Sequence, residues 1–125
     1  MLLKVSDIMH GGDALPLVDE TATMKEALLV MSSKNFGRTG VTNKVGDLVG
    51  FVSDGDLRRH MGDDLLDKPV KDVMNANPKS VAPDILAAEA LAIMNESSIT
   101  DLMVVDGTKP VGILRLHDIM RAGVA

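Results

Sequence analysis

Hydrophobic and polar residues follow the same order twice along the 125 residues of this chain. In each half, a short apolar turn (residues 5–9 and 70–74) and an irregular stretch come before a helix whose apolar residues recur at helical spacing. Two short apolar runs with a glycine-containing turn between them come next, and a second short helical segment follows. The predicted strand pairs are residues 39–42 with 48–52 and residues 102–105 with 111–114, and the predicted last helices are residues 54–61 and 117–122. This order predicts an α/β (α+β) fold built from two β-α-β-β-α units.

Local matches indicate that the two halves are copies of one unit. Residues 5–9 (VSDIM) match residues 70–74 (VKDVM), and residues 25–31 (KEALLVM) match residues 88–94 (AEALAIM). These matches predict a tandem repeat. The predicted boundaries are a first copy at 1–62, a second copy at 63–125 and a linker at 62–69. Because a domain of about 60 residues buries little surface alone, we expect the copies to pack face to face about a pseudo-twofold axis.

Each long helix has a predicted start and a predicted buried face. Thr23 lies three residues before Glu26, which is the spacing of a capping box, and Asp84 is the corresponding cap expected in the second copy. Residues at helical spacing should face the core, namely Ala27, Leu28 and Met31 in the first copy and Ile85, Ala88, Leu91 and Ala92 in the second. Four methionines on apolar faces are predicted to fill the core, at positions 24, 31, 94 and 120.

Composition excludes several classes of function. The net charge is −5 with no basic block, which argues against nucleic acid or an anionic membrane as the main partner. Two Phe without Tyr or Trp argue against platforms that stack nucleic-acid bases. Zero cysteines exclude disulfides, thiolate metal ligands and cysteine nucleophiles, and the three separated histidines predict no metal site.

The remaining signals indicate a chain that is not catalytic by itself. No order of serine, histidine and aspartate suggests a triad, and no nucleophile–base pair stands out. The apolar part of the N-terminus is too short for a signal peptide, and we expect it to mark a cut in a longer protein. The lack of cysteine fits a cytoplasmic location.

One strand–helix junction in the first copy has the chemistry of a nucleotide site. Ser53 places a hydroxyl at a helix start, where free N–H groups favour a phosphate, and Asp56 can accept two hydrogen bonds from a vicinal ribose diol. Gly50 would let a flat ring approach the strand, and Arg58 and Arg59 could pair with a phosphate or a carboxylate. The alternative is that Asp56 only caps the helix.

The second copy departs from this pattern. Arg115 stands where the first copy has Ser53, and His117 precedes Asp118, which corresponds to Asp56. The carboxylate for a ribose is therefore kept, but the small hydroxyl is lost. An arginine at this position would either bind an anionic ligand directly or fill the site and block it, and both interpretations remain open.

Two stretches resemble the signature of the CBS domain. They are residues 49–57 (VGFVSDGDL) and residues 111–119 (VGILRLHDI), each with an apolar strand, a glycine, two apolar residues and an aspartate that opens a helix. The resemblance implies further ligand contacts at the start of the second strand of each copy: Arg38, Thr39, Thr100 and Asp101. The alternative for both threonines is that they are strand formers. His10, in a glycine-containing loop, is a further candidate at the mouth of the site.

A closer similarity is to the C-terminal CBS pair of bacterial arabinose-5-phosphate isomerases, through residues 53–59 and 116–124. It implies a regulatory module without the catalytic sugar-isomerase domain, in an enzyme that feeds synthesis of the lipopolysaccharide sugar Kdo. The implied ligand is a nucleotide or nucleotide-sugar between the copies, either CMP-Kdo or an adenine nucleotide, with no required cofactor. The alternative is a module that senses nothing and assembles the isomerase, as a homodimer through its helices.

Overall fold

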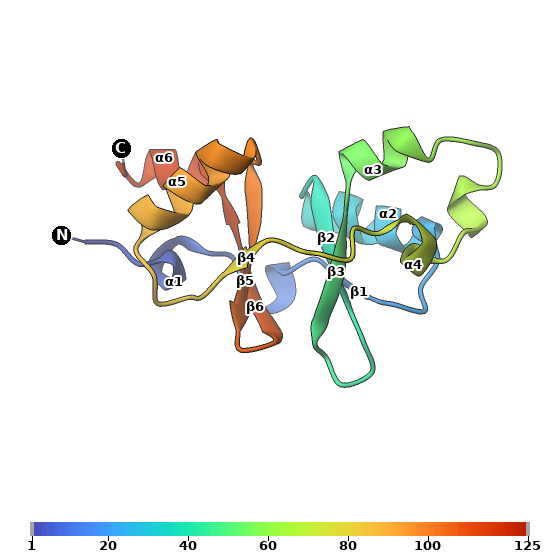
Figure 1. Ribbon diagram of the computed structural model, residues 1–125, viewed down its shortest axis with the longest axis horizontal. Coiled ribbons are helices and arrows are strands. Elements are labelled where there is room, and N and C mark those ends of the chain that lie inside the picture. The colour runs from blue at the N-terminus through green and yellow to red at the C-terminus, as the bar shows by residue number, and fades with distance from the viewer. Residues whose placement is uncertain (1, 125) are drawn as a thin grey trace. The chain divides into compact units, whose positions relative to one another are not determined.

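Both predicted β-α-β-β-α units are present in the structure, a computed structural model that describes residues 2–124 (Figure 1). The first comprises β1 (Leu17–Asp19), α2 (Met24–Lys34), β2 (Arg38–Thr42), β3 (Leu48–Ser53) and α3 (Asp54–Arg59). The second comprises β4 (Ser80–Val81), α5 (Ala87–Ser97), β5 (Asp101–Asp106), β6 (Lys109–Arg115) and α6 (Leu116–Arg121). The predicted apolar turns are one-turn helices, α1 (Val5–Ile8) and α4 (Val70–Val73), and two 3₁₀ turns complete the chain, η1 (Gly12–Ala14) and η2 (Leu65–Asp67).

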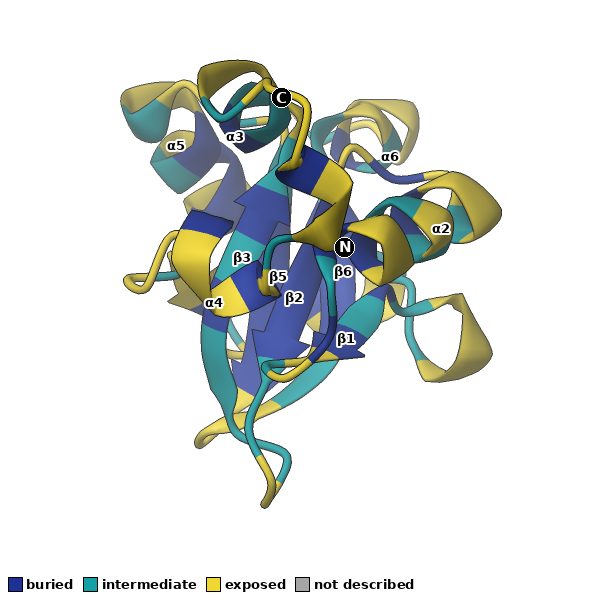
Figure 2. Ribbon diagram, turned by 90° about the vertical axis from the view of Figure 1, so that its right-hand side faces the viewer, coloured by how far each residue is buried: buried dark blue, intermediate teal, exposed yellow. Residues whose placement is uncertain are grey.

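The strands form two three-stranded sheets with the same topology. In each sheet the first strand runs parallel to the second and the second pairs antiparallel with the third, in the orders β1-β2-β3 and β4-β5-β6. The predicted hairpin turns place Gly46 and Gly107 at positive φ, 86° and 66°, which glycine adopts without steric cost. Strands β2 and β5 are almost wholly buried, whereas α2 and α4 carry exposed residues (Figure 2).

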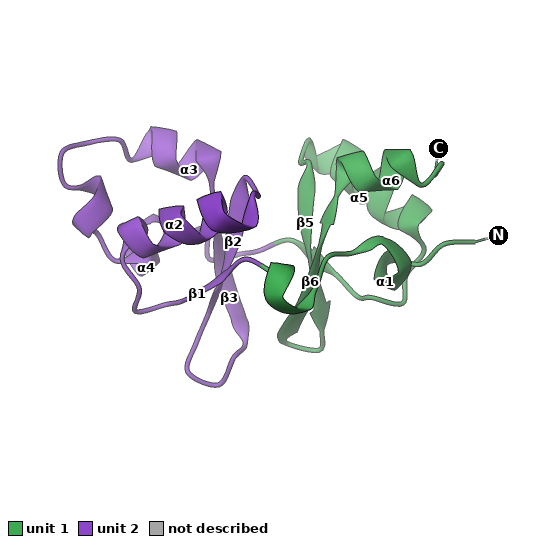
Figure 3. Ribbon diagram, turned by 180° about the vertical axis from the view of Figure 1, so that it is seen from behind, with its two compact units in different colours: residues 1–15, 79–125 green, residues 16–78 purple. Residues whose placement is uncertain are grey.

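The chain separates into two compact units that exchange a segment (Figure 3). Unit 2 is the continuous stretch of residues 16–78, and unit 1 combines residues 1–15 with residues 79–125. Helix α1 therefore belongs to the same unit as the second repeat, and α4 belongs to the same unit as the first. The repeat boundaries at 1–62 and 63–125 stay a prediction about sequence copies, and their outer ends at Met1 and Ala125 lie outside the described residues.

Equivalent hydrogen bonds attach the exchanged helices. Val5 donates its backbone N–H to the carbonyl of Ile85 at 2.9 Å, and Val70 donates to the carbonyl of Ala22 at 2.8 Å. Both valines are fully buried. Residues 62–69 are therefore not a free linker, because Leu65 is buried in unit 2 and the Lys68 carbonyl accepts the backbone N–H of Met24.

The start of α2 is confirmed, but the start predicted for α5 is wrong. The Thr23 hydroxyl accepts the backbone N–H of Glu26 at 3.3 Å, as its spacing predicts. Helix α5 begins after Leu86 rather than at Asp84, and Ala87 donates its N–H to the carbonyl of Leu3 at 2.8 Å. The exchanged N-terminal segment thus fixes this helix end, which a local capping pattern cannot reveal.

The shifted start also changes which residues of α5 are buried. Its buried residues are Ala87, Ala90, Leu91 and Met94, so the predicted burial of Ala88 and Ala92 is wrong. The methionines at 24, 31 and 94 fill the cores as predicted, but Met120 is 59% exposed. Within residues 2–124, no helix has the length and apolar character needed to cross a membrane.

Candidate functional site

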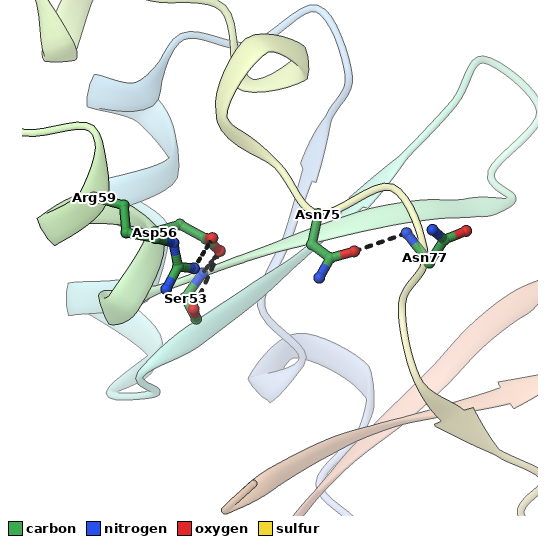
Figure 4. Close-up of polar contacts among 5 residues, drawn as sticks. All are labelled: Ser53, Asp56, Arg59, Asn75 and Asn77. Atoms are coloured by element: carbon green, nitrogen blue, oxygen red, sulfur yellow. Dashed lines mark hydrogen bonds and ion pairs between the residues drawn. The ribbon is translucent and has the colours of Figure 1, made fainter. Parts of the chain in front are cut away.

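Asp56 is held at the start of α3 by its own neighbours (Figure 4). Its Oδ2 accepts the backbone N–H of Ser53 at 2.9 Å and the Ser53 hydroxyl at 3.1 Å, and its Oδ1 pairs with Nη2 of Arg59. The carboxylate is buried, whereas the Arg59 side chain is 66% exposed. This arrangement gives Asp56 the helix-capping role that the sequence offered as the alternative. A ribose contact at Asp56 stays a prediction, and it would require a diol to take the place of Arg59 or Ser53.

Gly50 has a packing reason to lack a side chain. A Cβ placed on it would meet the side chain of Met74 and the carbonyl oxygen of Asn75. This oxygen accepts the backbone N–H of Phe51, and the Asn75 N–H donates to the Phe51 carbonyl. Met74 and Asn75, which follow the one-turn helix α4, therefore occupy the space beside Gly50 that was expected to admit a flat ring. Contact of Gly50 with a ligand stays a prediction.

The remaining predicted residues of the first copy lie in different environments. Thr39 is fully buried and donates its hydroxyl to the Gly40 carbonyl at 3.2 Å, which favours its role as a strand former. Arg38 is buried, and its guanidinium carbon lies 4.1 Å from the centre of the Phe51 ring in a cation–π contact. Arg58 is exposed on α3. These three residues therefore differ in burial and in contacts.

In unit 1, four predicted residues line one pocket of about 460 Å³. They are Thr100, Asp101, Arg115 and His117, and the other lining residues are Leu116 and Met120. The antiparallel register places Asp101 opposite Arg115, and Leu116 donates its backbone N–H to the Thr100 carbonyl at 2.8 Å. The strand start, the strand end and the helix start are thereby held together. The pocket presents an arginine and a histidine beside one carboxylate and a hydroxyl, which suits an anionic ligand.

Asp118, two residues into the same helix, has a partner that the sequence did not reveal. Its Oδ2 lies 2.6 Å from Nε2 of His10, and the side chains are 18% and 39% exposed. His10 reaches it because the loop after α1 pairs through its backbone with Ile113 of β6. The repeat offset could have suggested an equivalent position for His10 at Asn75, but not the imidazole–carboxylate contact.

The two copies share one sheet topology, and a known family model also matches the chain twice. The pattern of the CBS domain matches residues 5–63 and again residues 70–125. The chain belongs to the CBS domain family. The CBS resemblance predicted from the two signature stretches is thereby confirmed, and the pair spans nearly the whole chain.

Similar proteins include bacterial arabinose 5-phosphate isomerases. Arabinose 5-phosphate isomerase KdsD of Escherichia coli K12 is 44% identical over 126 aligned positions, which cover 99% of this chain and 38% of that protein. The chain therefore spans about 38% of the length of this relative. The predicted similarity to arabinose-5-phosphate isomerases is confirmed for this region.

Solved CBS structures have the same fold. CBSX2 in complex with AMP has a TM-score of 0.83 and 27% sequence identity, over 97% of this chain and 96% of that chain. The CBS domain pair of MJ0100, in complex with 5′-methylthioadenosine and S-adenosyl-L-methionine, has a TM-score of 0.87 at 21% identity, over 98% and 97% of the two chains. At that identity the second likeness supports the fold alone.

Proposed function

We propose that this CBS pair is a regulatory module that binds a nucleotide or nucleotide-sugar. The observation that carries the proposal is the pocket of about 460 Å³ in unit 1, which combines Arg115 and His117 with Thr100 and Asp101. Its volume lies in the range of small-molecule sites. Four predicted polar residues, at the start of β5, the end of β6 and the start of α6, converge there, which a purely structural surface would not require.

The polar groups of this pocket define a ligand class. Arg115 offers a planar fork of donors that suits a phosphate or a carboxylate, and Thr100 and Asp101 offer polar contacts for hydroxyl groups. CMP-Kdo carries both a phosphate and a carboxylate, so it is the nucleotide-sugar that we propose first. An adenine nucleotide is the second choice, supported by the AMP complex of CBSX2 at 27% identity.

The parent protein that we propose is a cytoplasmic arabinose-5-phosphate isomerase acting in Kdo and lipopolysaccharide synthesis. This rests on 44% identity to KdsD over 99% of the chain. The catalytic sugar-isomerase domain would lie in the remainder of that longer protein, and the CBS pair alone should not turn over arabinose 5-phosphate. Regulation requires that the ligand bind one state of the enzyme more tightly than another.

Thermal unfolding with a ligand panel tests the sensor proposal. The panel is AMP, ATP, S-adenosylmethionine, CMP and CMP-Kdo, and a ligand at 100 times its Kd should stabilise the fold by about 2.7 kcal/mol. Arg115→Ala should remove the midpoint shift, whereas Arg121→Ala, which removes the same charge from the exposed end of α6, should keep it. If none of the five compounds shifts the midpoint of the unsubstituted chain, the sensor proposal is wrong.

Exposed apolar side chains favour assembly as the second candidate function. Leu29 on α2 is 61% exposed and Met61, just beyond α3, is 72% exposed. Exposed apolar side chains on a helix and beside one suit a homodimer contact, which would bury them. Sedimentation equilibrium of the chain and of Leu29→Glu measures this. A dimer that Leu29→Glu dissociates, together with no ligand-induced midpoint shift, would favour assembly over sensing.

A further inference from the structure

The two equivalent carboxylates, Asp56 and Asp118, are held in different ways. Each lies three residues after the residue that ends the last strand of its sheet, Ser53 or Arg115. Asp56 is held by Ser53 and Arg59, both within three residues of it. Asp118 is held by His10, which lies 108 residues away in the sequence.

Backbone contacts fix His10 beside β6. His10 donates its N–H to the Ile113 carbonyl at 2.9 Å, and Ile113 donates to the His10 carbonyl at 2.8 Å. In unit 2, Asn75 makes the same pair of bonds with Phe51 at 2.8 and 3.0 Å. The Asn75 side chain, however, accepts the backbone N–H of Asn77 at 2.9 Å, away from Asp56 (Figure 4). The imidazole–carboxylate contact is therefore a property of unit 1.

His10 occupies an acceptor position that a ribose would use. A vicinal diol bound by a carboxylate donates one hydrogen bond to each oxygen. Because Nε2 of His10 lies 2.6 Å from Oδ2 of Asp118, the imidazole already fills one acceptor site of this carboxylate, and a diol that approaches the same oxygen competes with it. We propose that His10 is a built-in competitor for ligand at Asp118, and that ligand binding there loosens the N-terminal segment of unit 1. This inference rests on the proposed nucleotide-binding function.

The release of His10 has a direct route along the chain. His10 lies five residues before Leu15, where the chain leaves unit 1, and the next residue, Pro16, accepts the backbone N–H of Gly40 in unit 2 at 3.0 Å. Displacement of Arg59 from Asp56 frees only a side chain that is already 66% exposed. The ligand signal therefore passes through Asp118 and His10, not through Asp56.

Two probes that differ by one hydroxyl isolate this contact. AMP has the vicinal diol and 2′-deoxy-AMP lacks it, and calorimetric titration gives the Kd of each. His10→Ala should lower the Kd of AMP about tenfold, equivalent to about 1.4 kcal/mol, and leave the Kd of 2′-deoxy-AMP within about twofold. The gain should disappear in the double variant His10→Ala with Asp118→Ala. His60→Ala, which removes the imidazole that follows α3 in unit 2, should leave both Kd values unchanged.

Hydrogen exchange tests whether ligand binding loosens the N-terminal segment of unit 1. AMP should speed amide exchange at residues 5–15 of the unsubstituted chain by about threefold or more, and 2′-deoxy-AMP should not. AMP binding that is indifferent to His10→Ala, or unchanged exchange at residues 5–15, overturns the competitor proposal and leaves the proposed function standing. If neither the unsubstituted chain nor His10→Ala binds any compound of the ligand panel, the competitor proposal and the proposed function are both wrong. If only His10→Ala binds AMP, the result supports the two proposals together.

Discussion

Met74 lies directly over Gly50, so that a Cβ on Gly50 would fall 2.6 Å from the Met74 sulfur and 2.8 Å from the Asn75 carbonyl oxygen. The same relation holds in the other unit between Met9 and Gly112, at 2.5 Å from the sulfur. Each glycine of the CBS signature is thus covered by the two residues that follow a one-turn helix, α4 for Gly50 and α1 for Gly112. Both glycines therefore have a packing role, because a side chain at either position would collide with these residues.

Gly50→Ala should destabilise unit 2. The methionine side chain can shift, but the Asn75 carbonyl is held by backbone bonds to Phe51, so the added methyl group forces the backbone apart. We expect a loss of about 1–3 kcal/mol in the free energy of unfolding, measured in urea. Gly62→Ala is the matched control, because its Cβ would meet its nearest neighbour at an ordinary 3.6 Å. Equal stability of the two variants would contradict this account.

Asp56→Ala should cost about 1–2 kcal/mol of unfolding free energy even without a ligand. The substitution leaves the Ser53 N–H and hydroxyl without their acceptor and removes the partner of Arg59. Asp54→Ala removes an exposed carboxylate from the same helical turn and should cost less. Urea unfolding of both variants measures the difference. An Asp56→Ala protein as stable as Asp54→Ala would show that the capping contacts contribute nothing.

Thr39→Val decides between the two interpretations of that residue. The side chain is fully buried and its hydroxyl bonds the Gly40 carbonyl, so a ligand cannot reach it without strand movement. We expect the Kd of a bound nucleotide to stay within about twofold and the stability to change by about 1 kcal/mol. A tenfold weaker nucleotide in Thr39→Val would establish Thr39 as a ligand contact.

The order of elements and the two hairpins could be predicted because their signals are local, whereas no residues could be assigned to the short strands β1 and β4. Thr23 and Glu26 predict a helix start within four residues, and each hairpin has a glycine in the turn between its two apolar runs. The start of α5 could not be predicted, because it is set by the bond from Ala87 to Leu3, far away in the sequence. The exchange of α1 and α4 could not be predicted either. Their sequences are similar, so either helix could pack on either copy.

In the candidate site, too, contacts set by neighbouring strands could be predicted and contacts set by distant segments could not. Thr100, Asp101, Arg115 and His117 flank two paired strands, so their proximity follows from the hairpin, and the structure places them around one pocket. The contact of His10 with Asp118 depends on which unit receives the N-terminal segment. Asp56 could be recognised as a cap or a ligand, but its ties to Ser53 and Arg59 required coordinates.

Asp19 should make the stability of unit 2 depend on pH. The Thr21 hydroxyl and backbone N–H both bond its carboxylate and hold the pKa of Asp19 below its ordinary value, with Lys71 adding a favourable charge. Because this pKa is depressed in the folded state, the stabilisation is present above the pKa of unfolded Asp19 and is lost as pH falls through the folded one. Thr21→Val should raise the pKa of Asp19 in a carboxyl NMR titration, and Thr21→Ser should keep it low. A pKa that is the same in both variants would contradict the role of the hydroxyl.

Val5 and Val70 offer a direct test of the segment exchange. Both are fully buried at equivalent positions, but Val5 packs with Leu102 and Leu114, whereas Val70 packs in the core of unit 2. Val5→Ala and Val70→Ala should each lower the free energy of unfolding by about 1–3 kcal/mol, through a cavity in one core.

If the units are as the structure has them, Val5→Ala should speed hydrogen exchange mainly in residues 79–124, and Val70→Ala mainly in residues 16–78. If cooperative units instead followed the sequence copies, Val5→Ala would loosen residues 2–62 and Val70→Ala residues 63–124. Because the two substitutions remove the same atoms, the reversal of the exchange pattern between them, and not its size, decides which description is right.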